Sequence, residues 1–247
     1  MSALKTLSLV TLGMLEMPIG WTTAAAQTAS GDPWKVTFAP YLMGAGMSGT
    51  AAIAGQEATV DASASDILSH LQFGAMGVVV ARKGNWSVGG DFIWMALGAT
   101  SETPPANVDP NQGAFAFYGG RRLSAAADVT FGVRWNVLQG RIGFTGPAQR
   151  VVEQTKQWVD PIVGLNLRSQ GAHRVHAGLY SEIGGFGAGS TLSWQIFPTV
   201  GIDLGKRTAV EFGYRWLDLD YESGEGLTRF KYDVLTQGPV MGLAFRF

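Results

Sequence analysis

The sequence ends with GPVMGLAFRF, residues 238–247, and in this stretch apolar side chains occupy every second position. Met241, Leu243, Phe245 and Phe247 form one row, while Val, Gly, Ala and Arg stand between them. A period of two places the two rows on opposite faces of a β-strand. Terminal residues of soluble proteins usually fray into water. A strand so apolar at the end of a chain therefore predicts lipid against one of its faces.

The same two-residue period recurs in three earlier segments, DVTFGVRWNV (128–137), TLSWQIFPTVGIDL (191–204) and AVEFGYRW (209–216). Each carries bulky apolar residues on one face and Gly, polar or charged residues on the other. A helix would repeat its apolar residues with a period near 3.6. Strands that cross a membrane in a barrel need one face for lipid and one for the lumen. These segments predict such strands.

The composition fits an exported membrane barrel better than a soluble domain. Charged residues make up 15% of the 247 residues, well below the ~25% typical of soluble domains, and 34 residues are Gly. The net charge of −1 provides no basic field for nucleic acid. The absence of Cys excludes disulfides, thiolate metal ligands and Cys nucleophiles.

The N-terminus has the features of an export signal. Lys5 precedes an apolar stretch, and Ala24 and Ala26 supply small residues for cleavage. Residues 1–26 are therefore predicted to be a signal peptide, with a buried helix as the alternative, and residues 27–247 to be the barrel domain. No run of ~18 apolar residues follows. The sequence thus predicts no transmembrane helix and a location in the cell outer membrane.

We predict an all-β fold, a transmembrane antiparallel up-and-down β-barrel of about ten strands, with eight as the alternative. An even number returns the last strand to the side of the first, which closes the barrel and removes exposed edges. Pro40, Pro161, Pro198 and Pro239 fall inside strand patterns, where each removes a ladder donor and predicts a bulge or register break. The predicted strands cover residues 34–48, 72–83, 86–99, 112–121, 124–139, 157–169, 172–184, 191–203, 208–221 and 230–247.

Short and long connections alternate along the chain. Outer-membrane barrels have short periplasmic turns and longer external loops, so this alternation predicts the same topology. In the first long loop, Ile67, Leu68 and Leu71 have the spacing of a short helix capped by Ser63 or Ser65. Short polar breaks fall at 82–85, 121–124, 168–174 and 204–207, and longer polar segments at 49–71, 101–111, 140–156, 185–190 and 222–229.

A soluble β-sandwich is the alternative fold, because its strands also alternate. The outer face of a sandwich would be polar. Here Phe, Trp, Leu and Val stand opposite Gly, Asp and Arg, and the polar row of a barrel of this size must face inward. The pattern favours the membrane barrel.

Several segments resemble motifs of a known family. PYLMGAGMSG, ARKGNW, FGVRWNV, WVDPIVGL, EIGGFGAGSTLSWQ, FGYRWLDLDY and GPVMGLAFRF occur in this order over nearly the whole mature chain. Together they are similar to motifs of small Gram-negative outer-membrane β-barrel proteins, most of which are recorded only as hypothetical outer-membrane proteins. The resemblance implies the fold and the location and no established activity. Val80 departs from the pattern, which would have an acidic residue just before ARKG, so one lumen charge is missing.

Charged residues recur on the small-or-polar face of the predicted strands. Charges of both signs in a narrow, low-dielectric lumen must pair, because an isolated buried charge is costly. The sequence therefore predicts a salt-bridged core in which Arg134 and Arg215 pair with acids such as Glu182 and Glu211. The alternative is a narrow hydrophilic pore lined by Arg134, Glu182 and Arg215. The predicted lumen charge network comprises Asp91, Arg134, Asp160, Arg168, Glu182, Glu211 and Arg215.

A catalytic site finds little support in the sequence. Ser–His hydrolysis needs a base beside the nucleophile and a third group that orients the base. The only histidines are His70, His173 and His176, and no lipase or acyltransferase motif surrounds His70 and its neighbour Ser69. We therefore expect His70 to be a surface loop residue. An outer-membrane lipid-modifying hydrolase or acyltransferase is the alternative.

The predicted protein is a monomeric, non-enzymatic outer-membrane barrel without a cofactor, with a structural, surface-interaction or narrow-pore role. Its predicted partners are outer-membrane lipid and the barrel assembly machinery. The terminal Phe247, with Phe245, resembles the assembly signal that this machinery reads on barrel precursors. Asp218, Asp220 and Glu222 could offer oxygen ligands to Ca²⁺. Acids near a loop are more often solvated, so no metal site is predicted.

Overall fold

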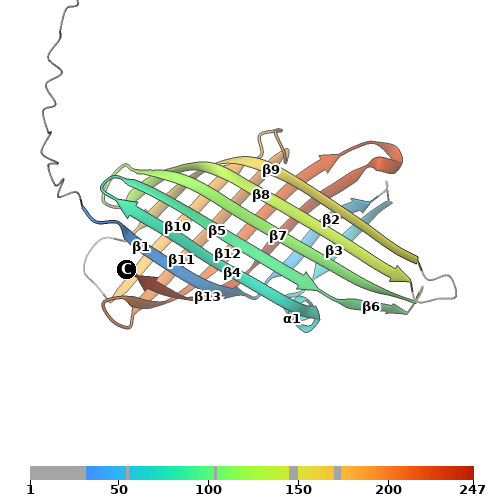
Figure 1. Cartoon of the computed structure of the whole chain (residues 1–247), viewed down its shortest axis with the longest axis horizontal. Helices are drawn as coiled ribbons and strands as arrows, with labels where there is room; N and C mark the ends of the chain where they lie inside the picture. Colours follow the sequence, from blue (N-terminus) through green and yellow to red (C-terminus); the bar gives the residue numbers. More distant parts are fainter. Residues whose placement is uncertain (1–31, 54–55, 103–104, 145–149, 170–173) are drawn as a thin grey trace, which may run out of the picture. The chain divides into compact units, whose positions relative to one another are not determined.

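The computed structural model describes residues 32–53, 56–102, 105–144, 150–169 and 174–247. The predicted signal peptide, residues 1–26, lies outside them. The described residues form long, tilted antiparallel strands with one short α-helix (Figure 1). The elements are β1 (Lys35–Met43), β2 (Gly46–Ile53), β3 (Gln56–Ala62), α1 (Ala64–His70), β4 (Leu71–Lys83), β5 (Trp86–Leu97), β6 (Ala99–Glu102), β7 (Pro105–Arg122), β8 (Ala127–Phe144), β9 (Arg150–Arg168), β10 (Val175–Gly184), β11 (Leu192–Asp203), β12 (Thr208–Ser223), a 3-10 turn (Gly226–Thr228) and β13 (Phe230–Arg246).

The sheet closes into a barrel of ten strands. They follow one another in the order β1, β4, β5, β7, β8, β9, β10, β11, β12 and β13, and β13 pairs again with β1. In this seam Phe38 lies opposite Phe245, and the Phe247 amide donates to the Val36 carbonyl at 2.8 Å. The prediction of a closed, ten-stranded antiparallel barrel is confirmed.

The first strand of the barrel continues along β13 beyond its pairing with β4. Tyr41 lies opposite Gly242, and Met47 lies opposite Thr236. Both pairs belong to one register, so β1 and β2 form a single line of pairing along β13. β3 then folds back beside β2.

Two walls extend the barrel at the end that carries the longer connections. β4 accompanies β1 only as far as the pair Pro40–Gly77, and β10 accompanies β9 only over residues 162–168. Beyond these points β7, β8 and β9 form one wall (the β7–β9 wall), and β13, β2 and β3 form another (the β13–β3 wall) (Figure 1). We call this end of the barrel the long-loop end. The other end, where β1 begins and β13 finishes, is the short-turn end.

Side-chain exposure follows the predicted alternation. In β8, Phe131 is 57% exposed and Trp135 is 42% exposed, whereas Arg134 between them is 2% exposed. In β13, Met241 and Leu243 are exposed in the same way. One row of each strand thus forms an apolar outer surface and the other fills the lumen. An exposed apolar surface around a closed barrel is the form that suits contact with lipid.

The short helix begins at the predicted cap. The Ser63 hydroxyl accepts a hydrogen bond from the Asp66 amide at 3.2 Å, and the Asp66 carboxylate accepts one from the Ser63 amide at 3.0 Å. This capping box satisfies two backbone donors. The hydrogen bonds from Ser63 hold the pKa of the exposed Asp66 carboxyl below its usual value. Within the described ranges, no helix combines the length and hydropathy that a membrane span requires.

Three of the predicted long loops are mostly strand, and one of them, 49–71, contains the end of β2 and all of β3 beside the short helix. The described residues of segments 101–111 and 140–156 belong largely to β6, β7, β8 and β9. These parts lie in the wall at the long-loop end, where both faces of a strand can be polar. Their sequence therefore shows no alternation of apolar residues, and a pattern without alternation predicts a loop.

The expected proline register breaks are wrong. In the described ladders, the one register shift lies between Leu71 and Phe73 of β4. Pairing lapses briefly at Pro40 and at Pro198 and resumes in the same register on both sides. A missing N–H removes one ladder bond, and the flanking pairs are numerous enough to keep the strands aligned.

The lumen differs between the two ends of the barrel. The sequence predicts a polar lumen throughout, yet buried apolar side chains fill much of the half toward the long loops. Burial of apolar area stabilises this half by ~25 cal/mol per Å² removed from water. The apolar cluster comprises Tyr41, Met43, Ala45, Met76, Ile93, Met95, Ala114, Trp158, Leu217, Leu219, Phe230, Tyr232, Val234 and Val240.

Candidate functional site in the lumen

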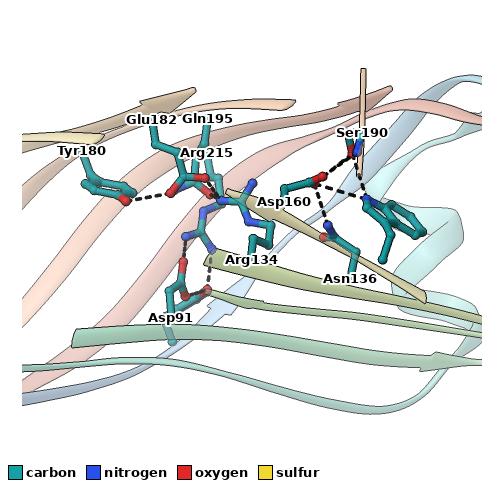
Figure 2. Close-up of polar contacts among 11 residues, drawn as sticks. Asp91, Arg134, Asn136, Asp160, Tyr180, Glu182, Ser190, Gln195 and Arg215 are labelled. Atoms are coloured by element: carbon teal, nitrogen blue, oxygen red, sulfur yellow. Dashed lines mark hydrogen bonds and ion pairs between the residues drawn. The ribbon is translucent and has the colours of Figure 1, made fainter. Parts of the chain in front are cut away.

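Arg215 of β12 reaches across the lumen to Asp91 of β5 (Figure 2). The two side chains form an ion pair, and Arg215 is 1% exposed. The Tyr41 hydroxyl donates to Asp91 Oδ1 at 2.8 Å and accepts from Arg215 Nη1. The Phe197 ring centroid lies 4.8 Å from the guanidinium carbon. A buried ion pair offsets its loss of hydration only with such additional contacts.

Arg134 of β8 forms a second buried ion pair, with Glu182 of β10 (Figure 2). The Tyr180 hydroxyl donates to Glu182 Oε2 at 2.7 Å, and Arg134 Nη2 donates to Gln195 Oε1 at 3.4 Å. Both charged side chains are almost fully buried. We call Asp91, Arg134, Glu182 and Arg215 the ionic layer.

Asp160 is held by neutral groups. Its carboxylate accepts hydrogen bonds from Asn136 Nδ2 at 2.9 Å, from Trp158 Nε1 at 3.2 Å, and from the Ser190 amide and hydroxyl at 2.6 and 2.8 Å. Arg134 stands directly opposite Asp160 in the β8–β9 ladder but extends toward Glu182. Within the described residues, no cation lies at ion-pair distance from Asp160.

A third charged group surrounds Asp128 near the short-turn end. Arg168 binds its carboxylate through two hydrogen bonds, of 2.5 and 3.1 Å. Arg82 lies 3.5 Å and Arg122 3.9 Å from the same carboxylate. The two-point contact uses the planar fork of the guanidinium, which matches a carboxylate in geometry.

The acids and bases of the short-turn rim pair among themselves. His176 Nε2 lies 2.8 Å from Glu211 Oε1, and Arg246 Nη1 donates to Asp203 Oδ1 at 2.6 Å. Arg246 faces inward, as the alternation of the last strand predicts.

The structure corrects the pairing expected for Arg215 and Asp160. Glu211 lies two inward positions from Arg215 on the same strand, or about 13 Å at ~3.3 Å per residue. Arg215 therefore pairs with Asp91 and Glu211 with His176. Asp160, which the sequence places among paired charges, is solvated by neutral donors instead. Arg134 and Glu182 come together as expected.

A cavity lies on each side of the ionic layer. The smaller one, of about 160 Å³, lies toward the short turns and is lined by Val80 and Tyr118 as well as by Arg215. The larger one, of about 340 Å³, lies between the walls at the long-loop end and is lined by Phe230 and Tyr232. The ionic layer and the apolar cluster occupy the space between the cavities.

Several residues that bind or belong to the lumen charges are not predicted from the sequence. Tyr41 and Gln195 lie on inward rows, so the alternation that places Arg215 in the lumen could also have found them. Ser190 lies in the connection between β10 and β11, where no alternation exists to indicate its direction. Asp128 shares the polar row of Arg134 and could have been predicted as a lumen charge.

The geometry around His70 does not form a nucleophile–base pair. His70 Nδ1 lies 2.8 Å from the Asp66 carbonyl oxygen and 3.1 Å from Ser69 Oγ. A carbonyl can only accept, so Nδ1 carries the proton and is not free to take one from Ser69. The Asp66 carboxylate, a potential orienting group, is engaged by Ser63. His176 lies at the short-turn end, and His173 lies outside the described residues.

The acids of β12 do not assemble into a metal site. Glu222 accepts a hydrogen bond from Arg229 Nε at 2.6 Å. Asp218 and Asp220 point outward, away from the lumen row of β12. In the part of the chain that the structure describes, no group of three or more His, Cys, Asp or Glu side chains is arranged to hold a metal ion.

No protein-family model and no curated protein matches the sequence. Solved structures with a similar fold include the outer membrane protease OmpT from Escherichia coli, with a TM-score of 0.58 at 9% identity over 90% of this chain and 99% of that chain. Ail, the attachment invasion locus protein of Yersinia pestis, has a TM-score of 0.40 at 10% identity over 87% of this chain and 99% of its own.

Neisserial surface protein A has a TM-score of 0.33 at 10% identity, over 87% of this chain and 97% of its own. At such identities a structural similarity shows the fold alone, and the similarity to OmpT is the one that supports the fold. The closed antiparallel barrel, its apolar outer surface and this structural similarity lead to one conclusion. The chain has the fold of a Gram-negative outer-membrane β-barrel.

Proposed function

We propose that the chain is an integral outer-membrane protein with a closed lumen, which interacts with ligands at its long-loop end and neither conducts ions nor catalyses a reaction. The ionic layer is the observation that carries this proposal. Its two arginines are at most 2% exposed and bind carboxylates of other strands, Arg215 four strands away around the barrel and Arg134 two strands away. A hydrated pore would need water at these guanidinium groups. Short turns face the periplasm in such barrels, so the larger cavity would face the cell exterior.

Conductance in planar bilayers tests the closed lumen. The wild-type protein should show no steady openings. The double substitution Asp91→Ala with Arg215→Ala removes both partners of one buried pair, so it strands no charge, and it should produce transient openings at most, because the apolar cluster still separates the two cavities. The matched control, Glu222→Ala with Arg229→Ala, removes an ion pair outside the lumen and should stay silent. Steady ion-selective openings of the wild-type barrel would contradict the proposal.

The non-enzymatic assignment is tested separately on lipid A. Cells that express the wild-type chain, cells that express His70→Ala and cells without the chain should yield the same lipid A by mass spectrometry. The reason is that His70 Nδ1 donates to a backbone carbonyl and offers no base to Ser69. A modification that requires both the chain and His70 would favour the hydrolase or acyltransferase instead.

A further inference from the structure

The larger cavity has the size of a small-molecule site. Its volume is about 340 Å³, toward the lower limit of the ~300–1,000 Å³ usual for such sites. Leu138 lines it from the β7–β9 wall, and Met47, Phe230 and Tyr232 line it from the β13–β3 wall. Two separate walls thus supply one apolar enclosure.

The enclosure continues toward the ionic layer as packed apolar side chains. Phe230 and Tyr232 belong to the same buried cluster as Trp158, whose ring centroid lies 6.4 Å from that of Tyr232. The deep side of the cavity is therefore apolar, and a ligand that enters from the long-loop end meets hydrocarbon and aromatic surface. Apolar matter in this position gains by leaving water.

The charges at the cavity are of one sign. Lys156 lines it, half-buried, with its ammonium 5.5 Å from the Phe230 ring centroid. Arg141 also contributes to the lining, and none of the lining residues is Asp or Glu. Among the described ion pairs, none includes Lys156. A half-buried cation without a carboxylate partner favours an anionic group on the ligand.

We propose that this cavity binds a single-chain anionic amphiphile, with the hydrocarbon chain among Met47, Leu138, Phe230 and Tyr232 and the acidic head group beside Lys156. The modest volume suits one chain rather than two. The inference names the ligand class for the long-loop end and rests on the closed lumen proposed above. The ligand can be a free fatty acid from the medium or a single-chain acidic lipid from the membrane, because both present the same chemistry.

Saturation binding of radiolabelled laurate to the protein in phosphatidylcholine nanodiscs tests the site, with empty nanodiscs subtracted. Wild type should bind one laurate per barrel. Lys156→Gln should weaken laurate binding by about tenfold or more, because it removes a charged partner, and should leave binding of dodecanol unchanged. Lys231→Gln is the matched control: this lysine lies beside Phe230, faces outward and pairs with Asp233. It should bind laurate like wild type.

Cavity-filling variants test the apolar part. Ala51→Trp should abolish binding of both laurate and dodecanol, since Ala51 lines the cavity. Leu138→Trp serves the same purpose if Ala51→Trp does not reach the folded, heat-modifiable form. Dodecyltrimethylammonium, which has the same chain with a cationic head, should bind at least tenfold more weakly than laurate.

Mass spectrometry of an organic extract of the purified protein separates the two sources. A single-chain acidic lipid in the extract identifies the membrane as the source, and an empty extract with saturable laurate binding identifies the medium. An empty extract without saturable laurate binding would overturn the inference. An equal loss of laurate affinity in Lys156→Gln and Lys231→Gln would also overturn it. A silent barrel that binds no amphiphile overturns this inference alone. A conducting barrel that binds laurate overturns the closed lumen alone.

Discussion

At the scale of the residue, the lumen stabilises its buried charges in two ways. Arg215 and Asp91 neutralise each other, whereas the Asp160 carboxylate is stabilised by four hydrogen bonds from neutral donors. Both solutions satisfy the requirement that a buried ion be paired or fully hydrogen-bonded. They differ in what a substitution leaves behind, because only the ion pair strands a charge when one partner is lost.

Arg215→Leu should therefore destabilise the barrel strongly. It leaves the Asp91 carboxylate buried without its cation, and breaking a buried pair costs ~3–5 kcal/mol. The midpoint of thermal unfolding in detergent, followed by the gel mobility of heated samples, should fall. Adding Asp91→Leu to the same chain removes the stranded carboxylate and should restore much of the loss. An unchanged midpoint in Arg215→Leu would mean that the ionic layer is hydrated and loosely packed.

Ser63→Ala should raise the pKa of Asp66 toward its ordinary value. The lowered pKa stems from hydrogen bonds that Ser63 donates to the carboxylate. Because the folded-state pKa is lowered, this contribution to the helix cap is present above the ordinary Asp pKa and is lost as the pH falls through the lowered value. An NMR titration of the Asp66 carboxyl measures it. Ser69→Ala is the control, since the Ser69 hydroxyl contacts the Asp66 backbone carbonyl and His70 but forms no hydrogen bond with the carboxylate; equal pKa values in both variants would contradict the cause.

At the scale of the element, alternation predicts the face of a residue but not its partner across the lumen. The period of two places Phe131 outside and Arg134 inside correctly. It contains no information on which strands face each other, so Arg215 is assigned to Glu211 on its own strand rather than to Asp91 on β5. Alternation also fails where a strand has no apolar row, which is why the sequence predicts loops for parts of the walls. The described residues of segment 140–156, which are 140–144 and 150–156, pair in β8 and β9 although their sequence lacks an apolar row.

Leu243→Arg should weaken the barrel more than Phe247→Arg. Leu243 lies in the outward row of β13, within the strand, and a charge on the lipid face costs ~2–4 kcal/mol at the membrane midplane and ~0–1 kcal/mol near the interface. Phe247 lies at the short-turn rim. Unfolding in lipid vesicles with urea gives both free energies. A larger loss for Phe247→Arg would contradict the assignment of the outward row.

At the scale of the whole molecule, the last strand closes the barrel, and we predict that its terminal residue also carries an assembly signal. Phe247 is 74% exposed, and its backbone pairs with Val36. Its side chain therefore contributes little to the packing of the closed barrel.

Deletion of Phe247 should lower the amount of barrel in the outer membrane of cells while refolding in detergent stays nearly intact. The backbone bonds at the chain end are few, whereas a lost assembly signal would act on every precursor. Heat-modifiable mobility on a gel measures the amount of folded barrel both in cells and after refolding in detergent. Equal yields of wild type and the deletion in cells would refute the signal, and Leu243→Ala, which keeps the terminal Phe, is the control.

The seam between β13 and the line of β1 and β2 joins the two ends of the chain. Closing so long a loop costs the most chain entropy, and contacts of such wide sequence separation form slowly. The seam is therefore the last ladder to form, and until it does β1 and β13 each present a bare edge, the template on which strands of other chains add. A polypeptide cut short before Phe230 lacks β13, so β1 and β12 stay bare for its lifetime, and its expected fate is aggregation or proteolysis rather than insertion.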